Sequence, residues 1–165
     1  MLQTFAIWLE GTPISQLIQN QLWIIPAVQI VHILAIAALL SSAGMISLRL
    51  LGRDGTGMSI GETANRYMPW IWSAIIILAL TGSILVTGEP RRSITNPAFQ
   101  IKMAMLVVAL CFIGGFAVRA RRTSTEGQFA VGPPMKAGSL ITFLLLLAIA
   151  VAGRWIAYVI VPDAY

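Results

Sequence analysis

Residues 22–48 read LWIIPAVQIVHILAIAALLSSAGMISL, an almost unbroken apolar run with one histidine, His32, inside it. A helix needs about 20 predominantly apolar residues to cross a bilayer, and this run exceeds that length. His32 is the only histidine in the chain. A titratable side chain within a membrane span is costly unless it has a partner, so His32 marks a candidate functional site.

The composition indicates lipid as the solvent for most of the chain. Of its 165 residues, 58% are hydrophobic and only 10% are charged, whereas a soluble domain carries about 25% charged residues. The net charge is +5, but most basic residues lie beside apolar runs, a pattern of membrane topology and not of nucleic-acid binding. The single cysteine, Cys111, excludes an intramolecular disulfide and a Cys-based metal motif.

The apolar runs predict an all-α integral membrane four-helix bundle that forms one domain, residues 1–165. The spans are expected at about 22–51, 67–86, 97–118 and 140–161. Polar loops are expected at 52–66 and 119–136, and a turn at 87–90 followed by a loop to Asn96.

Residues 1–21 are too interrupted for a span. Thr12-Pro13 reads as an N-cap and first helical residue, as does Asn96-Pro97 before the third span. The segment 1–21 is expected to be a short amphipathic element in the membrane interface. The alternative is a lead-in packed on the helix ends.

The basic residues predict the orientation. They gather around the loops after the first and third spans: Arg49, Arg53, Arg66, Arg119, Arg121, Arg122 and Lys136. Because Lys and Arg favour the cytoplasmic side, both termini and the loop 89–96 are expected to face the periplasm of a bacterial inner membrane.

With that orientation, three spans each place one nitrogen-bearing side chain in the outer half of the bilayer: His32, Lys102 and Arg154. Arg91 lies just above them, and Gln29 lies one helical turn outward from His32. Haem b would suit this arrangement, because imidazole is a common axial ligand and cations nearer the surface suit the propionates. His32 is then the iron ligand. The sixth ligand would be a methionine, be absent, or be His32 of a second protomer in a homo-oligomer.

Other interpretations remain open. His32 could bind a quinone, or copper together with methionines, although no copper motif is present. Lys102 and Arg154 could instead reach the headgroups while His32 bonds to a neighbouring helix, as in a non-catalytic accessory subunit of a larger membrane complex. The sequence contains no nucleophile–base pair, and its acidic residues all fall outside the predicted spans. A stand-alone enzyme is therefore not the favoured interpretation.

Four short stretches resemble a group of bacterial four-helix membrane proteins of unknown function, loosely related to the copper-resistance protein D domain and to the HemJ type of protoporphyrinogen oxidase. They are Val31-His32-Ile33-Leu34, Leu48-Arg49-Leu50-Leu51-Gly52, Gly88-Glu89-Pro90 and Asn96-Pro97-Ala98-Phe99-Gln100-Ile101-Lys102. The resemblance implies a four-helix membrane fold and haem binding, with His32 and Lys102 as the matching positions. It also implies copper handling as an alternative.

Overall fold

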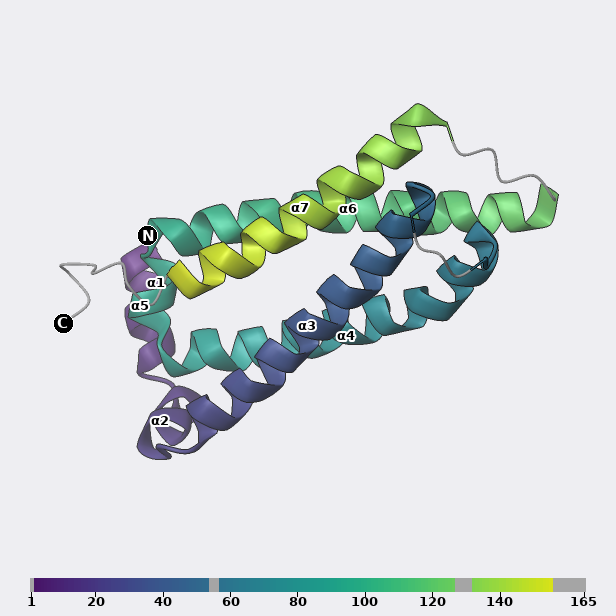
Figure 1. The fold of residues 1–165 in the computed structure, drawn as a ribbon. Helices are drawn as coiled ribbons and strands as arrows, with labels where there is room; N and C mark the ends of the chain where they lie inside the picture. The colour runs from purple at the N-terminus through teal and green to yellow at the C-terminus, as the bar shows by residue number, and fades with distance from the viewer. Residues whose placement is uncertain (1, 54–56, 127–131, 156–165) are drawn as a thin grey trace.

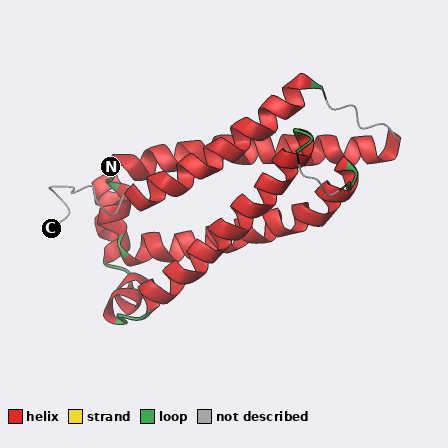
Figure 2. Ribbon diagram, viewed as in Figure 1, coloured by secondary structure: helices red, strands yellow, loops and turns green. Residues whose placement is uncertain are grey.

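The computed structural model describes residues 2–53, 57–126 and 132–155, and within these ranges every regular element is a helix (Figures 1 and 2). In chain order the helices are α1 (Leu2–Glu10), α2 (Pro13–Asn20), α3 (Ile24–Leu50), α4 (Ile60–Gly88), α5 (Pro90–Ile94), α6 (Pro97–Glu126) and α7 (Pro133–Trp155).

Four of these helices are long and apolar enough to cross a membrane: α3, α4, α6 over Pro97–Val118 and α7 over Pro133–Gly153. Most of their side chains face outward, and on α3 alone Ile30, Ile33 and Leu34 are exposed. Apolar surfaces of this extent on helices long enough to span a bilayer are typical of membrane proteins. The described part of the chain is therefore an all-α, multi-pass membrane protein with four spans, as the sequence predicts.

The bundle consists of two helix pairs. Helix α3 packs along α4, and α6 packs along α7 (Figure 1). The pairs meet where α3 contacts α7 and, over a shorter length, where α4 contacts α6. The α3–α7 contact is close: a Cβ atom on Gly44 would lie 3.2 Å from the ring of Phe143, and Ser47 Oγ donates a hydrogen bond to the Ser139 carbonyl at 3.2 Å.

The apolar core lies in the half of the bundle near that contact. It is built from the inward faces of all four long helices, with Leu50 only 2% exposed. The buried residues of this cluster are Leu39, Ala43, Ile46, Leu50, Ile71, Ala74, Ala109, Ile113, Leu146 and Ile149. This packed half fixes how the two pairs sit against each other.

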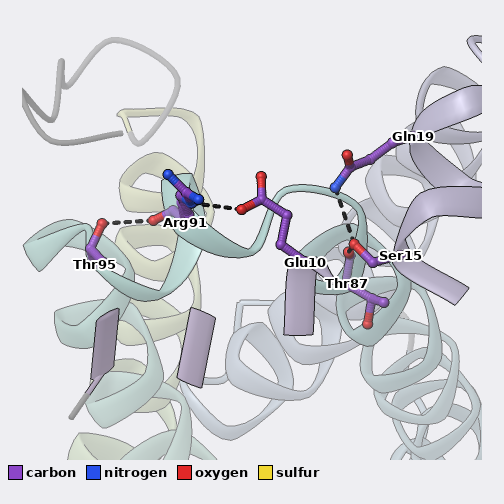
Figure 3. Close-up of polar contacts among 6 residues, drawn as sticks. All are labelled: Glu10, Ser15, Gln19, Thr87, Arg91 and Thr95. Atoms are coloured by element: carbon purple, nitrogen blue, oxygen red, sulfur yellow. Dashed lines mark hydrogen bonds and ion pairs between the residues drawn. The ribbon is translucent and has the colours of Figure 1, made fainter. Parts of the chain in front are cut away.

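The opposite end of the bundle, called here the cap end, carries α1, α2 and α5 (Figure 1). Arg91 Nε of α5 lies 2.6 Å from Glu10 Oε2 at the end of α1, and Figure 3 shows the two side chains facing each other. Ser15 Oγ of α2 donates to the Thr87 carbonyl at 2.7 Å and accepts from Gln19 Nε2 at 3.1 Å. These contacts tie α1 to α5 and α2 to the last turn of α4, where carbonyls lack partners within the helix.

The N-terminal helices also have a largely apolar exposed surface. Trp8, Ile14 and Leu17 are each more than 60% exposed. Ala6 and Ile18 are buried on the inner side. The predicted amphipathic segment is therefore two helices, and it packs on the helix ends while it exposes apolar side chains.

Three predicted loops contain helix. Residues 60–66 form the first turns of α4, because Ser59 and Glu62 make a reciprocal capping box with distances of 3.2 and 2.6 Å. Residues 90–94 form α5 in place of a loop, and α6 continues beyond Val118 to Glu126. The caps at Thr12 and Asn96 are confirmed: Thr12 Oγ1 accepts from the Ser15 amide, and Asn96 Oδ1 accepts from the Ala98 amide.

Candidate functional site

His32 lies on the inward face of α3. It precedes the buried Ala35 by three residues and the buried Leu39 by seven, which places all three on one stripe of the helix. The imidazole itself is only partly buried. It stands in the cap-end half of the bundle, beyond the packed apolar core.

Among the described residues, the imidazole has one hydrogen-bond partner, the hydroxyl of Thr81 on α4. Nδ1 of His32 and Oγ1 of Thr81 lie 2.7 Å apart. Oγ1 also lies 2.6 Å from the Ile77 carbonyl and 3.4 Å from the Leu78 carbonyl. Thr81 is 7% exposed, so this hydroxyl is held within the α3–α4 interface and is fully engaged there.

Gly82 follows Thr81 and lies beside the ring. A Cβ atom at position 82 would lie 3.7 Å from Cε1 of His32, with no other atom within 4 Å. The ring edge beyond Nδ1 is therefore bordered by bare backbone. Among the described residues Nε2 of His32 has no hydrogen-bond partner.

Lys102 lies on the inward face of α6, seven residues before the buried Ala109 and eleven before the buried Ile113. Its side chain reaches α7, where a Cβ atom on Gly153 would lie 3.2 Å from Nζ and 3.6 Å from Cε. Within the part of the chain that the structure describes, the ammonium group has no ion pair and no hydrogen bond. A partly buried cation without a partner is costly in a membrane, and this cost favours an anionic ligand.

The structure brings His32 and Lys102 to the same half of the bundle from different helix pairs. In this half His32 contacts Thr81 between α3 and α4, and Lys102 lies against Gly153 between α6 and α7. The two polar residues predicted from the sequence thus face the same interior.

Two of the other predicted site residues lie apart from this interior, and the side chain of the third is outside the described residues. Gln29 is exposed on α3 and makes no hydrogen bond among the described residues. Arg91 pairs with Glu10 at the cap end, with about 41% of its side chain exposed. Arg154 is in the last turn of α7, and its side chain lies outside the described residues.

Thr81 and the two glycines were not predicted from the sequence. Thr81 is one polar residue in an apolar run, and many such threonines bond only to their own helix. Gly82 and Gly153 carry no local turn signal. Their roles come from which neighbouring helix each one faces, and single-sequence spacing does not reveal this.

A separate apolar groove of about 560 Å³ lies between α6 and α7. It is lined by Ala98, Ile101, Met105, Leu144, Leu147, Ala148, Val151 and Ala152. Neither His32 nor Lys102 lines it, and several of its lining residues are exposed on the outer surface. It is therefore a feature of the lipid-facing side and not of the candidate site.

The described residues contain no group of three or more His, Cys, Asp or Glu side chains that could hold a metal ion. Comparison of the chain with protein-family models, curated proteins and solved structures found no match. The resemblance to copper-resistance protein D and HemJ-type proteins therefore stays a prediction.

Proposed function

We propose that this protein is a bacterial inner-membrane redox protein that binds haem b between its two helix pairs, with His32 as the axial ligand. One observation carries the proposal. The only imidazole of the chain and an ammonium without a described partner face the same interior from α3 and α6. The proposal extends to electron transfer, because bound haem would supply a reversible one-electron couple.

The residues present fit the chemical parts of a haem. Nε2 of His32 is free of protein hydrogen bonds in the described region, as an iron ligand requires. Lys102 offers a cation for a propionate. Gly82 and Gly153 keep side-chain bulk away from both groups. Arg154 and Arg91 remain candidates for the second propionate, and Arg91 would have to share its charge with Glu10.

The chain has no second histidine, which limits the sixth iron position to a few options. Met103 is exposed on the outer face, and Met105 packs against the apolar core. A symmetric pair of protomers with His32 on both sides of one haem would satisfy the iron. That arrangement gives one haem for two chains, whereas an open or Met-ligated site gives one haem per chain.

The first test is absorption spectroscopy of the protein purified in detergent from haem-replete cells. We expect a Soret band that shifts on reduction with dithionite and is lost in His32→Ala. Lys102→Met should lower haem affinity about tenfold or more, because a charge-assisted hydrogen bond is worth about 1.5–3 kcal/mol. Lys102→Arg keeps the cation and serves as the matched control.

Other outcomes would replace the proposal. A well-folded protein without a Soret band, isolated with a stoichiometric protein partner, would favour an accessory subunit of a membrane complex. A band that persists in His32→Ala would remove His32 as the ligand. Retention of a quinone lost in the same variant would assign His32 to quinone binding.

The proposed orientation places the cap end in the periplasm and the Arg-rich loops in the cytoplasm. Full-length fusions with a reporter test this. A C-terminal alkaline phosphatase is expected to be active, and a C-terminal green fluorescent protein is expected to be dark. The reverse pattern would place the candidate site in the inner half of the bilayer.

A further inference from the structure

The hydroxyl of Thr81 has a hydrogen-bond arrangement that determines which nitrogen of His32 carries the proton. A threonine hydroxyl has one proton and can accept through its lone pairs. The nearest partner of Oγ1 on its own helix is the Ile77 carbonyl at 2.6 Å, and the second is the Leu78 carbonyl at 3.4 Å. Carbonyls only accept, so the hydroxyl proton is directed to them.

The contact with His32 then has one consistent direction. With its proton directed to Ile77, Oγ1 of Thr81 accepts at 2.7 Å, and Nδ1 of His32 is the donor. Neutral imidazole carries a single N–H, so Nε2 keeps its lone pair. The backbone of α4 thereby sets the tautomer of a side chain on α3.

We infer that Thr81 is a positioning residue, which holds neutral His32 in the Nδ1-protonated tautomer and presents the Nε2 lone pair to a bound electron-pair acceptor. The inference rests on the proposed function for the identity of that acceptor, the iron of haem. The tautomer itself is a property of the protein without ligand. Histidine ligands are commonly oriented in this way, by a hydrogen bond from the nitrogen that does not bind the metal.

The space around the ring agrees with this role. A Cβ atom at position 82 would lie 3.7 Å from Cε1 of His32, an ordinary van der Waals distance, so Gly82 borders the ring between its two nitrogens. Nε2 has no described protein partner that would compete for its lone pair. The Thr81 bond therefore fixes the Nδ1 side of the imidazole, and no described hydrogen bond engages Nε2.

The single histidine makes the test direct. Protein labelled with ¹⁵N-histidine gives one imidazole spectrum, in which protonated and unprotonated ring nitrogens are distinguished. In ligand-free protein, at a pH where the ring is neutral, we expect the proton on Nδ1. Thr81→Ser keeps the hydroxyl and should give the same spectrum. Thr81→Val removes it and should shift the population toward Nε2–H.

The matched control is Thr142→Val on α7. The Thr142 hydroxyl bonds the Gly138 carbonyl at 2.7 Å, four residues back, as Thr81 bonds Ile77, but it has no described contact with His32. Its removal should leave the imidazole spectrum unchanged. Far-UV circular dichroism and a single size-exclusion peak verify that each variant is folded. A proton on Nε2 in the wild type, or a Thr81→Val spectrum equal to wild type, overturns the inference.

Haem titration separates this inference from the proposed function. Loss of an outer-shell partner commonly lowers metal affinity about 10–100-fold, and we expect that loss for Thr81→Val but not for Thr81→Ser. If the wild type takes up no haem while its proton is on Nδ1, the positioning role stands and the haem proposal fails. If haem binds through His32 but the ligand-free protein carries the proton on Nε2, the haem proposal stands and the positioning role of Thr81 fails.

Discussion

The ammonium of Lys102 on α6 lies against the bare backbone of Gly153 on α7, where a Cβ atom would come 3.2 Å from Nζ. The absence of a side chain at position 153 gives the lysine its place inside the bundle. Gly153 differs in this from Gly138 on the same helix, where a Cβ atom would have no neighbour from another part of the chain within 4 Å. The two positions allow a controlled comparison.

Gly153→Ala should change ligand binding more than stability. Nζ is the end of a flexible side chain, so a shift of a few tenths of an ångström relieves the contact, at about 0.5–1.5 kcal/mol for a strained rotamer. The helix-propensity gain of up to about 1 kcal/mol largely offsets this. We expect an unchanged melting temperature in detergent but a lower haem affinity. Gly138→Ala should leave haem affinity unchanged, and equal affinities in both variants would contradict the role of Gly153.

Gly88→Ala should destabilise the cap end. A Cβ atom at position 88 would lie 3.0 Å from Cγ2 of Ile18 and 3.3 Å from Cδ1 of Ile25. The side chains of Ile18 on α2 and Ile25 on α3 would have to shift by a few tenths of an ångström, and overpacking typically costs about 1–3 kcal/mol. Denaturant unfolding of the purified protein measures this cost.

Ile18→Ala provides the test of that cause. It removes the nearest methyl group, so the cost of Gly88→Ala should fall by more than about 0.5 kcal/mol in the double variant, as for residues in contact. Strictly additive effects would show that the close approach of α2 to α4 does not determine the cost.

Ser47→Ala should weaken the contact between the two helix pairs by a small amount. Its hydroxyl donates to the Ser139 carbonyl on α7 at 3.2 Å. Such interhelical bonds in membranes average about 0.6 kcal/mol. The apolar core around Leu50 should therefore keep the fold intact. A loss of more than about 2 kcal/mol in detergent unfolding, beyond the largest measured values for such bonds, would assign a larger role to this bond than its geometry supports.

Ser59→Ala should shorten α4 at its N-terminus. The variant removes the acceptor for the Glu62 amide and one half of the capping box. Loss of such a cap costs about 0.5–2 kcal/mol. Hydrogen exchange should increase at residues 60–63 and stay unchanged at the cap end of the same helix. Ser59→Asp retains an acceptor and is expected to behave as wild type.

The spans were predictable because their signal is local. Apolar runs longer than about 20 residues require a bilayer whatever their neighbours are, and α3, α4, α6 and α7 follow these runs. The caps at Thr12 and Asn96 were also readable, because a cap involves residues adjacent in sequence. Ser59 and Glu62 carried the same kind of signal, but the glycines of the preceding stretch led to a predicted loop at 52–66.

The partners of the polar residues were not predictable in the same way. His32 bonds Thr81, 49 residues away, and Lys102 packs against Gly153 on a different helix. Both contacts depend on how α3 turns toward α4 and α6 toward α7. Arg91 was expected near a ligand, but α1 brings Glu10 to it at the cap end.

The sequence by itself determined the lipid environment, the four spans and the one imidazole among them, because hydrophobic length and residue type are properties of a single segment. Only the tertiary structure decided that the imidazole faces a threonine whose hydroxyl is already committed to its own helix. It also decided that the Lys102 side chain lies in the same half of the bundle, packed against Gly153. These are contacts between helices, and the physical reason is that helix rotation and pairing are set by packing across the whole bundle.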